Sequence, residues 1–141
     1  MKVALDPNVL VSAFTTRGLS ADVFRLVIAE HEMVRSEVVM AEFERVMTDR
    51  FGIPPRLMTG FLADLRLHGV VPGVKPAPGA LDFVRDPDDR LVAAAAITGA
   101  AEVLVTGDRD LLDVATQIPD LKVLSPRQFW EHLRTRGSSA R

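Results

Sequence analysis

Short apolar runs alternate along this chain with longer segments in which apolar residues recur at helical spacing. The short runs predict β-strands at residues 3–5, 33–36, 69–71, 102–105 and 121–124. The longer segments predict helices at residues 9–14, 22–29, 37–48, 88–98 and 126–133, and one more that opens at Pro54-Pro55. Residues 72–79 hold three prolines and two glycines and predict an irregular connector.

Strands that alternate with helices predict a parallel sheet with helices on both faces. The expected fold class is therefore α/β, a three-layer α/β/α sandwich with a mainly parallel, Rossmann-like central sheet. The 141 residues suffice for one domain, and no internal repeat indicates a second. We expect the domain to span residues 1–135 and residues 136–141 to form a disordered tail.

Two of the predicted strands end at an aspartate. The sequence VALDPN places Asp6 after the first strand, and VLVTGDRD places Asp108 after a later one. In open parallel sheets, ligands bind beyond the carboxyl ends of the strands. We therefore expect these two carboxylates to lie close together, although either one could simply belong to a turn or cap a helix.

A third acid stands on an apolar stripe. On a helical wheel of residues 37–48, Glu42 falls between Val38 and Val46. A glutamate on a buried face is disfavoured unless it is paired, protonated or bound to a metal. Two interpretations stay open: a metal ligand, or a glutamate at the edge of the stripe that pairs with an arginine.

Further acids crowd two helix starts. Asp86, Asp88 and Asp89 lie together in RDPDDRL, and Asp110 follows Asp108 in TGDRDLL. Aspartate is favoured at helix N-caps and in the first turn, but one residue suffices to cap each helix. Ionised carboxylates at close range repel each other, and a divalent cation removes that repulsion.

The ligand chemistry indicates a hard cation. The chain has no cysteine, and its three histidines are scattered, so carboxylates dominate any metal site. Oxygen ligands of this kind suit Mg²⁺ or Mn²⁺ better than zinc. Asn8, Ser12 and Thr106 are short polar residues near the strand ends that could orient a carboxylate or a metal-bound water.

Composition limits the partners and the cell compartment that can be expected. The net charge is −2, so the chain has no overall basic character that would indicate nucleic-acid binding. All but three of the 17 basic residues are arginines, which reflects either a GC-rich genome or phosphate binding. Without cysteines or a long apolar run, we expect a cytoplasmic protein that makes no contact with a membrane.

Three motifs together resemble the PIN domain family. They are LDPNVLVSA near the start, RDPDDRLVAAAA in the second half and LVTGDRDLL after it. The order and spacing are most similar to the VapC-like toxins of toxin–antitoxin pairs, and the resemblance extends through nearly the whole chain to SPRQFW. The catalytic, metal-binding acids of the family fall on Asp6, Glu42, Asp89 and Asp108, with Asp110 as a further metal ligand. Its supporting polar residues fall on Asn8, Ser12 and Thr106.

This resemblance implies a function. A protein of this group would be a Mg²⁺- or Mn²⁺-dependent endoribonuclease that hydrolyses phosphodiester bonds of RNA. It would be the toxin of a type II toxin–antitoxin pair, inhibited by an antitoxin encoded beside it, and it would form a homodimer. Among the arginines, Arg17, Arg90 and Arg109 are candidates for contacts to phosphate.

One departure from the family keeps a second function open. Pro7 stands where the family usually has threonine, so a hydroxyl and a backbone donor are missing beside Asp6. The alternative is a catalytically weakened PIN scaffold that binds RNA or a protein without cleaving it. A phosphoacceptor receiver-like domain would also gather acids around Mg²⁺, but it needs a lysine at the pocket. Lys75 and Lys122 are poorly placed for that role.

Overall fold

A computed structural model of the chain describes residues 1–67, 69–72 and 76–139, the last four by their backbone alone. Its strands are β1 (Lys2–Leu5), β2 (Glu32–Val34), β3 (Val103–Val105) and β4 (Lys122–Leu124). They form one sheet in the order β2-β1-β3-β4, and each neighbouring pair is parallel. The two inner strands, β1 and β3, are therefore direct neighbours. The expected parallel sheet is confirmed.

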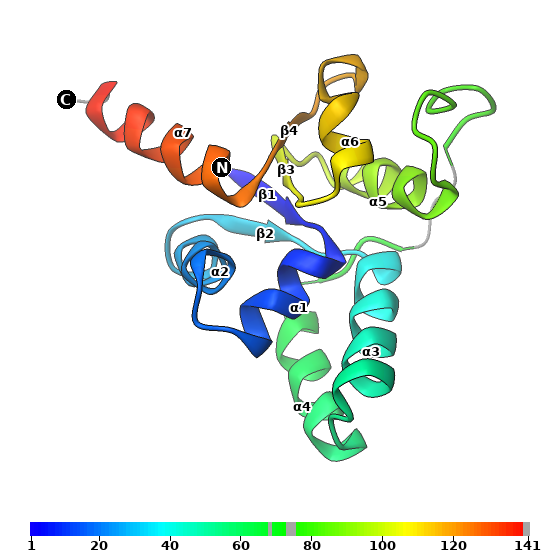
Figure 1. Ribbon diagram of the computed structural model, residues 1–141, viewed down its shortest axis with the longest axis vertical. Coiled ribbons are helices and arrows are strands. Elements are labelled where there is room, and N and C mark those ends of the chain that lie inside the picture. Colours follow the sequence, from blue (N-terminus) through cyan, green and yellow to red (C-terminus); the bar gives the residue numbers. More distant parts are fainter. Residues whose placement is uncertain (68, 73–75, 140–141) are drawn as a thin grey trace.

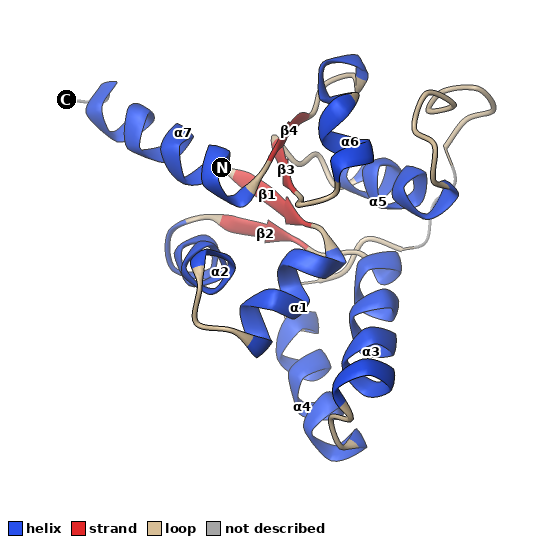
Figure 2. Ribbon diagram, in the orientation of Figure 1, coloured by secondary structure: helices blue, strands red, loops and turns tan. Residues whose placement is uncertain are grey.

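Helices cover this sheet on both faces. They are α1 (Pro7–Thr15), α2 (Leu19–Glu30), α3 (Glu37–Phe51), α4 (Pro55–Arg66), α5 (Pro87–Thr98), α6 (Arg109–Asp113) and α7 (Pro126–Ser139), with a short 3-10 turn at Ala115–Gln117. In Figure 1, α2 and α7 lie on one side of the strands, and α5 and α6 on the other. Figure 2 shows α1, α3 and α4 gathered in the lower part of the same view. The predicted three-layer α/β/α arrangement is confirmed.

The predicted strand at residues 69–71 is wrong for the residues described. Val71 makes a single bridge to Ser36, with its amide 2.7 Å from the carbonyl oxygen of Arg35. Gly69 has a φ of 89°, which is not a strand conformation, and Pro72 has no amide hydrogen to continue a ladder. The edge of the sheet beside β2 therefore gains one bridge and no strand.

The C-terminal helix is longer than predicted. It was expected to end near Leu133, but α7 continues to Ser139. The tail predicted to be disordered, residues 136–141, overlaps the last turn of this helix, and residues 140 and 141 lie outside the described residues. None of the described helices combines the length and the apolar character that a bilayer span requires.

An aromatic hub ties the first four helices together. The ring of Phe14 on α1 meets the rings of Phe24, Phe43 and Phe61 edge-on, with centroids 5.1–5.2 Å apart. These partners belong to α2, α3 and α4. Phe43 is fully buried, so α3, which also carries Glu42, has a fixed position relative to α1.

Helix α5 approaches the sheet through small residues. Ala93, Ala94, Ala95 and Ala96 are all buried. At the end of the helix, a Cβ on Gly99 would clash with Val34 and would lie 2.9 Å from a methyl carbon of Val71. The absence of a side chain there lets the C-terminal end of α5 lie directly against the sheet edge. The N-terminal end of the same helix carries Asp89.

Candidate active site

The two strand-end aspartates meet at the carboxyl edge of the sheet. Leu5 and Val105 are paired in register, and the residue after Leu5 is Asp6. The amide of Asp6 donates to the carbonyl oxygen of Val105 at 2.9 Å, so the backbone at Asp6 continues the pairing of β1 with β3. Asp108 follows β3 by three residues, and Asp6 and Asp108 both line one cavity. The structure therefore places both acids where the sequence predicted them.

Thr106 connects these two positions. Its hydroxyl donates to Oδ2 of Asp6 at 3.0 Å and accepts from the amide of Asp108, also at 3.0 Å. Thr106 is fully buried and Asp6 is only 3% exposed. Burial raises the pKa of Asp6 above its usual value, against the opposing effect of its hydrogen bonds to the Asn8 amide and Thr106. The hydroxyl thus fixes one oxygen of a carboxylate that has little access to water.

Three of the acids are helix caps as well. Asp6, Asp86 and Asp108 each accept a hydrogen bond from the amide two residues later, in each case at 2.8 Å. They cap α1, α5 and α6. The interpretation of these acids as helix caps is therefore correct. It is also incomplete, because a cap uses one carboxylate oxygen and fixes the direction of the other.

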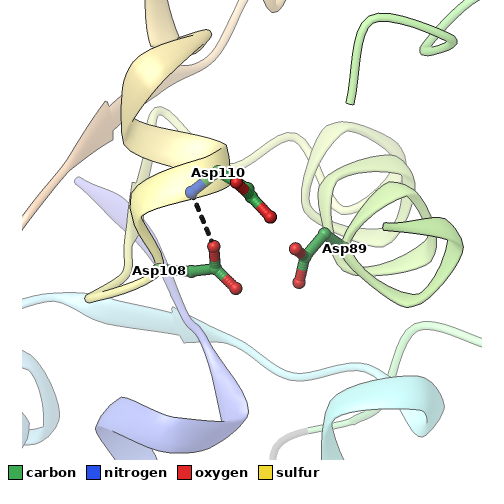
Figure 3. A group of neighbouring side chains, drawn as sticks. All are labelled: Asp89, Asp108 and Asp110. Atoms are coloured by element: carbon green, nitrogen blue, oxygen red, sulfur yellow. Dashed lines mark hydrogen bonds between the residues drawn. The ribbon is translucent and has the colours of Figure 1, made fainter. Parts of the chain in front are cut away.

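A three-carboxylate cluster lies between α5 and α6. One oxygen each from Asp89, Asp108 and Asp110 can be chosen so that all lie within 4.8 Å of one another. Figure 3 shows the three side chains pointing toward a common space, with the Asp110 amide bonded to Asp108. Asp89 is 9% exposed, and its buried Oδ2 has no hydrogen-bond partner among the described residues. Burial, followed by the negative charge of Asp108, raises the pKa of Asp89 to about 7.

Glu42 lies at the edge of the apolar stripe. The buried residues of α3 are Val39, Met40, Phe43 and Met47, whereas Val38 and Val46 are only half-buried. The Glu42 side chain is 39% exposed, and Arg45 binds both of its oxygens, Nε to Oε2 at 3.1 Å and Nη2 to Oε1 at 2.5 Å. Of the two interpretations that the sequence left open, the geometry is that of the arginine-paired glutamate. Glu42 nevertheless faces the acids.

Most of these groups, though not Thr106 or Asp110, line one cavity of about 360 Å³. Its polar lining consists of Asp6, Asn8, Glu42, Arg45, Asp86, Asp88, Asp89 and Asp108. Arg45 is the single basic side chain among the described residues that line it, so the cavity has a strong excess of negative charge. Asn8, one of the predicted supporting residues, reaches the cavity. Ser12 does not line it, and its hydroxyl lies 3.5 Å from that of Thr16.

One of the three arginines predicted to contact phosphate, Arg90, has a structural role. Arg90 donates from Nε to the carbonyl oxygen of Val84 at 2.6 Å, so it supports the connector before α5. Arg85 lies 4.0 Å from an oxygen of Asp110, beside the three-carboxylate cluster. Neither Arg45 nor Arg85 was selected from the sequence. For Arg45, its position three residues after Glu42 was the signal that could have identified it.

The donor set fits a divalent cation. Three carboxylates converge, and one of their buried oxygens has no partner within the described structure. An unpartnered buried oxygen is costly unless a proton or a cation completes its environment. Hard oxygen ligands of this type suit Mg²⁺, Mn²⁺ or Ca²⁺. The cluster is therefore a site at which a cation could be held.

Fold and cavity together define an α/β protein with a carboxylate site at the carboxyl edge of a parallel sheet. The chain belongs to the PIN domain family, whose model matches residues 2–110. That range includes every acid of the site. The fold is shared with a chain of VapBC2 from Rickettsia felis, whose crystal structure was solved with a DNA fragment from the promoter of that pair. The two chains are 18% identical with a TM-score of 0.56, over 87% of this chain and 97% of that one. No protein of curated function matches the sequence.

Proposed function

We propose that this protein is a metal-dependent endoribonuclease. The observation that carries the proposal is the cluster of Asp89, Asp108 and Asp110, with an unpartnered buried oxygen, in a chain of the PIN domain family. A carboxyl group whose pKa is raised by burial and by neighbouring acids, in a cavity, is a typical mark of a functional site. The reaction is hydrolysis of a phosphodiester bond, and the domain that performs it spans residues 1–135.

The roles of the residues follow from their positions. Asp89, Asp108 and Asp110 would hold Mg²⁺ or Mn²⁺, with Asp6 and Glu42 on the walls of the cavity that Asp89 and Asp108 also line. The cation supplies activation of a water molecule and screening of charge on the phosphate. Thr106 and the amide of Asn8 keep the carboxylate of Asp6 in one orientation. No side-chain nucleophile is required for this chemistry.

RNA is the substrate that we propose, on the basis of the resemblance to VapC-like proteins. An acidic cavity repels a polyanion, so binding depends on the cation and on basic groups at the rim. Arg45, on α3, pairs with Glu42, and Arg85, on the connector before α5, approaches Asp110. Guanidinium groups bind phosphate in a bidentate geometry, which suits both arginines for contacts to the backbone of the RNA.

A cleavage assay tests this function. The purified chain should cut single-stranded RNA in Mn²⁺ and lose that activity in EDTA. Asp6→Asn should lower the rate by about 10- to 100-fold, the range seen when residues that orient metal ligands are changed. Asp120→Asn is a matched control, because Asp120 is exposed and directly precedes Leu121 and β4, away from the cavity. Undiminished cleavage by Asp6→Asn would contradict the assignment, and cutting of DNA alone would contradict the substrate.

The alternative function, a scaffold that binds without cleaving, rests on Pro7. Pro7 occupies the first position of α1, where a backbone donor is not needed, and Asp6 caps the helix through the amide of Asn8. The loss of the backbone donor therefore has no structural cost, and only the missing hydroxyl remains as a reason for weaker activity. Calorimetric titration separates the two functions, since a scaffold without catalysis should show no specific Mn²⁺ site.

We also propose an antitoxin partner. The similar fold in the VapBC2 assembly supports a toxin–antitoxin role. A second cavity, of about 670 Å³, is lined by apolar side chains of α1, α2 and α4, among them Phe14, Phe24 and Phe61. Ile28 on its wall is 48% exposed, and its polar lining consists of Glu32, Asp64, Arg35 and His31. An apolar recess with charges of both signs in its lining suits a helix that has apolar anchors and charged flanking residues.

Co-expression tests this partner. The chain should co-purify with the product of a small adjacent reading frame, and Ile28→Asp should weaken the complex by about tenfold or more, because it places a charge in an apolar contact. Leu67→Asp is the matched control, since Leu67 is 75% exposed and does not line the cavity. Equal loss in both variants would place the contact elsewhere.

We also propose that the chain forms a homodimer, which light scattering of the purified chain would check.

A further inference from the structure

Glu42 and Arg45 form a closed pair at the wall of the acid cavity. Both oxygens of Glu42 are bound by one guanidinium group, through Nε at 3.1 Å and Nη2 at 2.5 Å. Both residues line the cavity that also contains Asp6, Asp89 and Asp108. As long as the pair is intact, Glu42 offers its oxygens to an arginine and to nothing else among the described residues.

The three-carboxylate cluster is complete without Glu42. It consists of Asp89, Asp108 and Asp110, which belong to α5 and to the start of α6. The Glu42 carboxylate is close enough for its charge to contribute to the raised pKa of Asp6. Glu42 is therefore a nearby acid whose charge acts on the site but whose carboxylate is bound by Arg45.

We propose that Arg45 is a positioning residue that withholds Glu42 from the cation site. Glu42 has two alternative partners, the guanidinium of Arg45 and a cation in the cavity. When Glu42 leaves Arg45, the guanidinium is free to pair with a phosphate of the substrate. This inference rests on the proposed function, because it assigns Arg45 a role in both cation binding and substrate binding at that site.

The strength of the pair suits such an exchange. The Arg45 side chain is 62% exposed and that of Glu42 39%, and exposed ion pairs three residues apart on a helix are weak. Competition from Arg45 should therefore lower the affinity for the cation by about two- to fivefold and no more. The pair weakens cation binding by Glu42 without preventing it.

A double-mutant cycle with Mn²⁺ as the probe tests this role. Calorimetric titrations would compare the wild type with Arg45→Gln, Glu42→Gln and the double variant. Arg45→Gln should bind Mn²⁺ about two- to fivefold more tightly, because Glu42 is released. In the Glu42→Gln background the same change should give little gain. Arg45→Lys, which keeps the charge but cannot bind both oxygens in the same way, should fall between the wild type and Arg45→Gln.

Removal of any positive charge near the cluster can raise cation affinity, so the cycle needs a matched control. Arg85→Gln removes a guanidinium 4.0 Å from Asp110 without touching Glu42, and its effect should be the same whether or not Glu42 is present. A gain from Arg45→Gln that persists undiminished with Glu42→Gln would overturn the proposed role and leave the proposed function intact. No Mn²⁺ binding by any variant, the wild type included, would overturn both.

Discussion

The Asp89→Asn variant is expected to lose RNA cleavage by about 100-fold or more, the size of effect seen when one group that stabilises charge in a reaction is removed. Asp89 contributes a carboxylate to the three-residue cluster, and its buried Oδ2 has no partner among the described residues. An asparagine has nearly the same shape but no charge for a cation. Initial rates in Mn²⁺, measured beside the wild type and the exposed control Asp120→Asn, would check this. A rate equal to that of the wild type would exclude Asp89 from the site.

The same substitution should stabilise the protein when no cation is present. The pKa of Asp89 is about 7 in the folded chain, whereas an ordinary aspartate has 3.8, so the folded state keeps a proton that the unfolded state releases. The contribution of Asp89 to the free energy of unfolding therefore falls as the pH rises from about 4 to about 7, and it stays lower above that range. The amide side chain of the variant does not titrate, so the variant does not lose this stability as the pH rises. Thermal unfolding in EDTA should show a gain of about 3–6 °C for the variant at alkaline pH that disappears toward pH 4.

Phe43→Ala is expected to cost about 3–5 kcal/mol of stability, the usual range for truncation of a buried phenylalanine. Phe43 is fully buried, and its ring meets that of Phe14 at 5.1 Å. Urea denaturation would measure the loss. Phe51→Ala is the matched control on the same helix, because Phe51 is 44% exposed and should cost about 1 kcal/mol or less. Similar costs for both variants would contradict the packing described for α3.

Elements with a strong periodic pattern were predictable from the sequence, and those that depend on tertiary context were not. The parallel sheet followed from the alternation of apolar runs with helical segments. Residues 69–71 have the apolar composition of a strand, but the left-handed backbone of Gly69 and the missing donor of Pro72 leave a single bridge at Val71. Gly69 and Pro72 are visible in the sequence, but the pairing of Val71 with Ser36 beyond β2 is a tertiary contact that the sequence does not show.

The candidate site was also predictable only in part. The proximity of Asp6 and Asp108 could be predicted, because neighbouring parallel strands end at the same edge. The position of Glu42 could not be settled, since a helical wheel does not show how far the core extends around α3. Ser12 was placed near the acids by the family resemblance and by its position in the first helix, but its hydroxyl lies beside that of Thr16. The approach of Arg85 to Asp110 joins a connector to another helix, which no sequence spacing reveals.

The caps at Asp6 and Asp108 make the fold tolerant of changes in the chemistry. Asparagine caps a helix about as well as aspartate does, so either residue can lose its charge while α1 or α6 keeps its first turn. On the proposed function, one nucleotide change at either position would therefore give a domain that is folded but no longer active. Loss of activity and loss of the fold are therefore separable at these two positions.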